Sequence, residues 1–130
     1  MKAVLPPGWP RPKGYSNGIS ASGRLIVTAG VVGWDAEEQF VSDTLAGQLA
    51  QVLRNVVAIL AEDGARPEHI VRMTCYVTDI EAYRLSLAEI GAAWKAIIGA
   101  HYPAMALVAV TSLVEPRALV EIEATAVVPE

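Results

Sequence analysis

The sequence has one cysteine, two histidines and no apolar run long enough to cross a membrane. Cys75 has no second cysteine with which to form an internal disulfide, and His69 and His101 lie too far apart in the sequence to show metal-ligand spacing. We therefore expect no structural metal. Only a short apolar run precedes the first prolines, too short for a secretion signal, so we expect a cytoplasmic protein without membrane contact.

Charge is also scarce, at 18% of residues, and the net charge is −4. A chain with this balance offers no basic field to a polynucleotide, which argues against nucleic acid as a partner. The length of 130 residues predicts one domain, and 53% hydrophobic residues is a high share for so short a chain, because small domains have a large surface relative to their volume. Some of the apolar surface is therefore expected to face another subunit.

Prolines and glycines, which interrupt helices and strands, are concentrated at the start of the chain, and residues 1–14 are predicted to form an extended N-terminal arm. The remaining residues, 15–130, are predicted to form a single domain. Two β-prone runs flank residues 21–24, where Gly23 can supply a positive φ, so we expect a first hairpin between Tyr15 and Ala29.

Two amphipathic helices are expected. Ser42 or Asp43 can cap the first, which stops before Gly64, and residues 78–81 have the pattern of a capping box that opens the second, which ends at Gly99. The apolar positions at helical spacing are Leu45, Leu49, Val52, Val56 and Leu60 in the first helix, and Tyr83, Leu87, Ile90, Trp94 and Ile97 in the second.

Strands are predicted at residues 70–77, 104–113 and 118–128. The first of these follows a helix, so parallel pairing to an earlier strand is expected. Residues 104–113 carry apolar side chains on both faces, whereas two helices can cover only one face of a sheet of five or six strands. Self-association through the uncovered face would bury the rest; a monomer with an apolar sheet face is the alternative.

The C-terminal segments Tyr102-Pro103-Ala104 and Val120-Glu121-Ile122-Glu123-Ala124 resemble those of the Rid (YjgF-like) family. Supporting matches are Tyr15, Thr28-Ala29-Gly30, Asn55 and Val77-Thr78-Asp79. The resemblance implies a chorismate-mutase-like α+β fold, with a mixed sheet of five to six strands and two helices on one face. It also implies a homotrimer with a barrel-like core and clefts between subunits. Members hydrolyse small imines or enamines, and the resemblance implies that no metal or organic cofactor is needed.

The resemblance also assigns roles at the cleft. Glu121 matches the glutamate that positions or activates water, but Met105 stands where the family has the arginine that binds the substrate carboxylate. Ala29, Leu87 and Leu107 also replace polar family residues, which predicts a pocket rebuilt for a larger or less acidic ligand. Loss of a bidentate arginine contact weakens binding of a small carboxylate imine by about one to two orders of magnitude.

Each candidate has an ordinary structural alternative. Glu121, on one strand face with Glu123 and Thr125, either acts as a general acid or base or is a solvated or ion-paired glutamate. Tyr15 either donates to a ligand or packs locally, and Trp34 either lines the cleft or anchors its loop. Met105 either lines the pocket or belongs to the core.

Two functional classes remain, with substrate against Tyr15, Trp34, Met105 and Leu107 in the first. In that class the chain is an imine or enamine hydrolase, deaminase-like, that uses Glu121 and does not act as the usual 2-aminoacrylate deaminase. In the second it is a non-catalytic trimer that binds or senses a small ligand. The ribonuclease activity sometimes attached to the family fits poorly with an acidic chain, and Cys75, alternating with apolar neighbours, is expected to be a buried, inert thiol.

Overall fold

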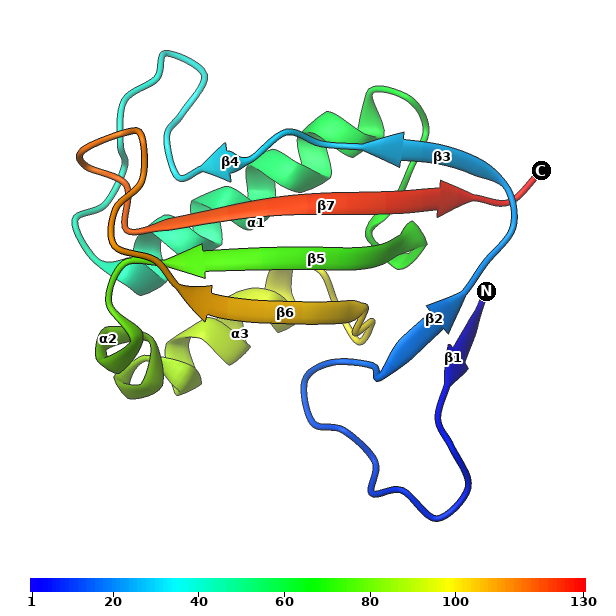
Figure 1. The fold of residues 1–130 in the computed structure, drawn as a ribbon. Helices are drawn as coiled ribbons and strands as arrows, with labels where there is room; N and C mark the ends of the chain where they lie inside the picture. Colours follow the sequence, from blue (N-terminus) through cyan, green and yellow to red (C-terminus); the bar gives the residue numbers. More distant parts are fainter.

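A five-stranded mixed sheet with helices on one face forms the body of the protein, and a small two-stranded sheet stands away from it (Figure 1). The computed structural model describes all 130 residues. This is the α+β architecture expected from the sequence. The elements in chain order are β1 (Lys2–Val4), β2 (Gly18–Ser20), β3 (Arg24–Val27), β4 (Val31–Val32), α1 (Leu45–Ala61), a 3₁₀ turn (Pro67–His69), β5 (Ile70–Val77), α2 (Ile80–Leu85), α3 (Leu87–Ile97), β6 (Ala104–Ala109) and β7 (Val120–Val128).

The main sheet has the order β3-β7-β5-β6, and β4 continues along the β7 edge that β3 begins (Figure 1). Pairing is antiparallel everywhere except between β5 and β6. A mixed sheet was expected, but the parallel partner of β5 is the later strand β6 and not an earlier strand. The chain between β5 and β6 contains α2 and α3, which supply the crossover that a parallel pair requires.

The predicted hairpin between Tyr15 and Ala29 is wrong. β2 pairs with β1, and β3 pairs with β7, so the two strands never pair with each other. Gly23 has a φ of 146°, and a Cβ there would lie 2.8 Å from the carbonyl carbon of Val128. The glycine is therefore needed for close passage along the end of β7. Within the predicted N-terminal arm, Lys2–Val4 form β1.

Helix α1 confirms the predicted apolar spacing, because Leu49, Val52 and Leu60 are all buried in the core. Its N-cap is Thr44 and not Ser42 or Asp43: the Thr44 hydroxyl accepts a hydrogen bond from the Gly47 amide at 3.1 Å. No helix of the protein is long and apolar enough to span a membrane.

The predicted second helix is divided at Ser86 into α2 and α3. Asp79, one residue after the predicted cap, accepts from the Ala82 amide at 3.1 Å. The Ser86 hydroxyl donates to the Ala82 carbonyl at 2.7 Å, and its amide donates to the Tyr83 carbonyl. These local hydrogen bonds satisfy carbonyl groups in the last turn of α2, so α2 ends there and α3 begins as a separate helix.

Strand β5 forms the centre of the core, with Met73, Cys75 and Val77 fully buried against the helices. A register irregularity between Ile70 and Arg72 also turns Ile70 inward, although strict alternation would place it on the opposite face. The face away from the helices carries exposed apolar side chains: Leu25, Val27 and Val108.

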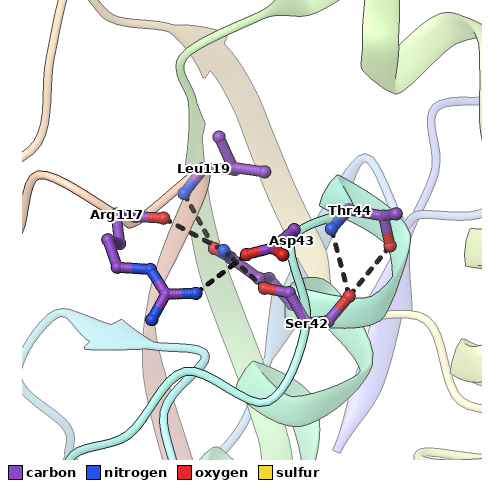
Figure 2. A network of polar contacts seen from close by, with 6 residues as sticks. Ser42, Asp43, Thr44, Arg117 and Leu119 are labelled. Carbon is purple, nitrogen blue, oxygen red and sulfur yellow. Dashed lines mark hydrogen bonds and ion pairs between the residues drawn. The ribbon is translucent and has the colours of Figure 1, made fainter.

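A buried polar clamp fixes the start of β7 to the first turn of α1. The Gln48 amide nitrogen donates to the carbonyls of Ser42 and Arg117, each at 3.0 Å, and its oxygen accepts from the Leu119 amide at 2.8 Å. Figure 2 shows Ser42, Arg117 and Leu119 around this network. Arg117 also pairs with Asp43 at 2.8 Å. Since Leu119 lies two residues before Glu121, the clamp sets the register of the strand that carries the candidate acid.

Candidate active site

A pocket of about 380 Å³ opens where α1, α3 and β6 meet the N-terminal arm. This volume lies within the range of roughly 300–1,000 Å³ that is usual for small-molecule sites. Eleven of its fourteen lining residues are hydrophobic. The pocket brings together four residues that the sequence singled out, namely Tyr15, Leu87, Met105 and Leu107.

The parallel pairing of β5 with β6 explains why Met105 and Leu107 face this pocket. Met105 lies beside Met73 and Leu107 beside Cys75, and both β5 side chains are fully buried on the helix side. Directly paired residues point to the same face of a sheet. Met105 and Leu107 lie on the edge strand, are half-buried and pack against the core, so they form the wall of the pocket that faces the core.

The arm is held over the pocket by backbone and side-chain bonds. The Ser16 amide donates to the Pro103 carbonyl at 3.0 Å, and its hydroxyl donates to the Tyr102 carbonyl. Next to this contact the rings of Trp94 and Tyr102 stack, with 6.2 Å between centroids and 8° between planes. Tyr15 thus reaches the pocket beside two other aromatic rings.

Glu121 lies on the opposite face of the sheet from this pocket. It pairs with Tyr76, whereas its neighbour Ile122 pairs with buried Cys75 and lines the pocket on the helix side of the sheet. A Cβ at Gly30 would lie 2.7 Å from the Glu121 carboxyl carbon, so a side chain at position 30 would displace the carboxylate from this place. Gly30 follows Ala29 directly, and the two predicted residues Glu121 and Ala29 therefore belong to a second cluster.

Tyr76, the residue of β5 that pairs with Glu121, has its own partner. The Tyr76 hydroxyl donates to Glu123 at 2.6 Å, and this hydrogen bond, with partial desolvation, raises the pKa of Tyr76. Glu121 takes part in none of the four ion pairs of the protein, and the nearby Arg117 pairs with Asp43.

Trp34 lies outside the residues that line the pocket. It packs on Phe40 at 5.8 Å between centroids, and the Asn55 side chain donates to its carbonyl at 2.7 Å. Within one chain these contacts match the loop-anchor interpretation. Cys75 is buried as expected, and burial raises the pKa of its thiol to about 12, so it carries no thiolate at neutral pH.

Comparison with known proteins places the chain in a family. The family model described as Endoribonuclease L-PSP matches residues 10–128. The chain belongs to the Rid (YjgF/YER057c/UK114) family. A solved Rid-family protein of unknown function from Yersinia pestis, YyfB, shares 33% identity with a TM-score of 0.85 over 98% of each chain, which confirms the chorismate-mutase-like α+β fold.

Curated relatives of this Rid chain include one with a named activity. The 2-iminobutanoate/2-iminopropanoate deaminase of Salmonella typhimurium is 31% identical over 117 residues, covering 87% of this chain and 86% of that protein. A RutC family protein of Aquifex aeolicus is 34% identical over 85 residues, covering 65% of this chain and 67% of that protein.

Several pocket residues of this Rid chain were not singled out from the sequence as site residues. Lys13 and Gly14 were assigned to the arm, and Tyr83 and Trp94 to a helix stripe. An apolar stripe indicates a buried face but not whether side chains or a ligand cover it. For Gly91, which lines the pocket from within α3, a glycine inside an otherwise regular helix was the available signal.

Proposed function

We propose that the protein hydrolyses imines or enamines of small molecules in clefts formed between copies of the chain, with Glu121 handling the water or its proton. The observation that carries this proposal is the division of the candidate residues between two surfaces. Tyr15, Leu87, Met105 and Leu107 line an apolar pocket, while Glu121 faces away from it across the sheet. A complete site then needs the pocket of one copy and the carboxylate of another.

The positions of the two surfaces favour a closed ring. Strands β6 and β4 lie at opposite edges of the sheet (Figure 1). Residues of β6 line the pocket, whereas Glu121 pairs with Val32 of β4. Joining opposite edges is a head-to-tail contact, which generates rings when the rotation closes. Leu25 and Val27 on the uncovered sheet face are 65% and 63% exposed and would gain burial in such a ring. We assign the ring three subunits from the resemblance described above.

The reaction needs few groups. Water adds to the C=N carbon, its oxygen forming the new C–O bond while one of its protons goes to Glu121. Glu121 passes this proton to the nitrogen, which gives a carbinolamine. The hydroxyl proton then moves to the nitrogen through the same carboxylate as the C–N bond breaks, so that ammonia leaves and the carbon becomes a carbonyl. A positioned carboxylate can serve both proton transfers in turn. Gly30 leaves the space that this carboxylate occupies.

The composition of the pocket bears on the substrate. Arginine is absent among the residues that line it, and Met105 occupies the position that the resemblance assigns to the carboxylate-binding arginine. Small carboxylate imines, such as those derived from 2-aminoacrylate, would thus lose their main anchor. We infer that they are not the preferred substrates.

An activity assay tests this inference. An amino acid oxidase supplies the imine, semicarbazide traps it, and hydrolysis by the protein lowers semicarbazone formation. Met105→Arg should raise kcat/KM for the alanine-derived imine roughly 10- to 100-fold, the effect of one charge-assisted contact. Rapid hydrolysis of that imine by the wild-type chain, with no gain in Met105→Arg, would refute the inference about the pocket.

Glu121→Gln separates an enzyme from a binding protein. An enzyme should lose turnover with ligand binding retained, because the amide keeps the shape but cannot accept the proton. Glu123→Gln is the matched control, since it makes the same change two residues away on the same strand face. If the wild-type chain binds 2-oxo acids but hydrolyses no imine, the non-catalytic trimer is the better description.

The family description as an endoribonuclease finds little support in this chain. Its net charge is −4, so binding to phosphates would lack the usual attraction. We therefore propose a small-molecule substrate.

A further inference from the structure

Lys13 has no role in the function proposed above, yet it lines the pocket. It is the one charged residue among the fourteen lining residues. None of the four ion pairs of the protein uses it. Because Lys13 is exposed and has no carboxylate partner, an anionic group of a ligand in this largely apolar pocket can pair with it.

Gly91 is the second unexplained feature. It lies inside α3, where glycine is less stable than alanine, and its φ is not positive. A Cβ built there meets no atom within 4 Å, so close packing does not require glycine. Since Gly91 lines the pocket, its missing side chain leaves room that a ligand can fill.

Aromatic rings give the third observation. Trp94 and Tyr102 stack beside the pocket, and Tyr15 and Tyr83 also line it. Flat aromatic walls favour flat or bulky apolar groups over a methyl group, because dispersion and burial grow with the contact area.

From these three observations we propose that the pocket selects imino acids with a bulky aromatic or branched apolar side chain, whose carboxylate is bound by Lys13. The bulky side chain occupies the space left by Gly91 and lies against Trp94. Lys13 supplies a positive charge from the arm, but lysine lacks the bidentate geometry of arginine, so an imino acid also needs its bulky side chain to bind. This substrate class rests on the proposed imine hydrolysis and deepens it.

Selectivity for size is tested with Gly91→Leu against Ala92→Leu, which adds the same side chain at the next, exposed position outside the pocket. Imines derived from phenylalanine and from alanine are compared. Gly91→Leu should lower kcat/KM at least about tenfold more for the phenylalanine-derived imine, since the added side chain fills the pocket. An equal effect on both imines, or the same shift in Ala92→Leu, overturns the assignment.

Binding of the carboxylate is tested with Lys13→Ala and Lys13→Arg, with Lys95→Ala as an exposed control on α3 outside the pocket. Lys13→Ala should raise KM for the phenylalanine-derived imino acid about tenfold while KM for its methyl ester changes little, and Lys13→Arg should restore acid binding. Unchanged KM for the acid in Lys13→Ala overturns the proposal.

A calorimetric measurement separates failure of this proposal from failure of the proposed function. Phenylpyruvate should bind more tightly than pyruvate, and Lys13→Ala should weaken phenylpyruvate binding about tenfold. If no imine is hydrolysed but this pattern is seen, the function fails and the ligand class stands. If imines are hydrolysed without any preference between the two 2-oxo acids, the ligand class fails alone.

Discussion

Replacing Gln48 with leucine tests whether the polar clamp fixes β7 to α1. Gln48 is 1% exposed and makes three hydrogen bonds to backbone groups of Ser42, Arg117 and Leu119. Gln48→Leu removes all three, at roughly 1 kcal/mol each. The more apolar leucine returns about 1 kcal/mol. The free energy of unfolding should therefore fall by about 2 kcal/mol.

Thermal and urea unfolding at fixed protein concentration measure this loss. With an unfolding entropy of about 2.1 cal/mol/K per residue, Tm should fall by about 7 °C. Gln51→Leu is the control, because Gln51 bonds only to the side chains of Asn55 and Arg54, and its change should be within about 0.5 kcal/mol. If the free energy of unfolding falls by less than about 0.5 kcal/mol in Gln48→Leu, or by the same amount in both variants, the claim that Gln48 fixes β7 to α1 is refuted.

Two further outcomes are expected. Cys75 should resist thiol reagents until the protein unfolds. Burial raises the pKa of its thiol from 9.0 to about 12, so the folded state holds the proton more tightly than the unfolded state. The free energy of unfolding should therefore fall as the pH rises from about 9 to 12. Fast labelling of the native protein would contradict this. Gly30→Ala should displace the Glu121 carboxylate and lower kcat roughly ten- to hundredfold. Gly18→Ala is the control and should leave kcat unchanged, because its Cβ would make an ordinary 3.6 Å contact. Equal activities of the two variants would refute the role given to Gly30.

Local patterns made the helices and β5 predictable. Leucine and valine at helical spacing are buried in α1, and alternation over residues 70–77 matches β5. The division at Ser86 was missed because its side chain bonds only to the preceding turn, a local alternative to the helix that spacing does not reveal.

Pairing between distant strands was not predictable from local signals. Gly23 suggested a tight turn, yet its close neighbour is Val128 at the far end of the chain. The sequence likewise placed Glu121 on the correct strand face but could not separate it from Met105. Only the register of β7 and β6 on β5 puts them on opposite faces.

Mixing of subunits tests most directly whether each site is shared between two chains. Glu121→Gln keeps the pocket, and Leu87→Trp fills it from a position that is 54% exposed. The two variants are each expected to be inactive, and they are refolded together in equal amounts. In a head-to-tail ring, random assembly joins an intact pocket to an intact Glu121 in about one quarter of the clefts, so the mixture should regain about one quarter of wild-type activity. Activity that stays at the level of the separate variants would contradict the shared site.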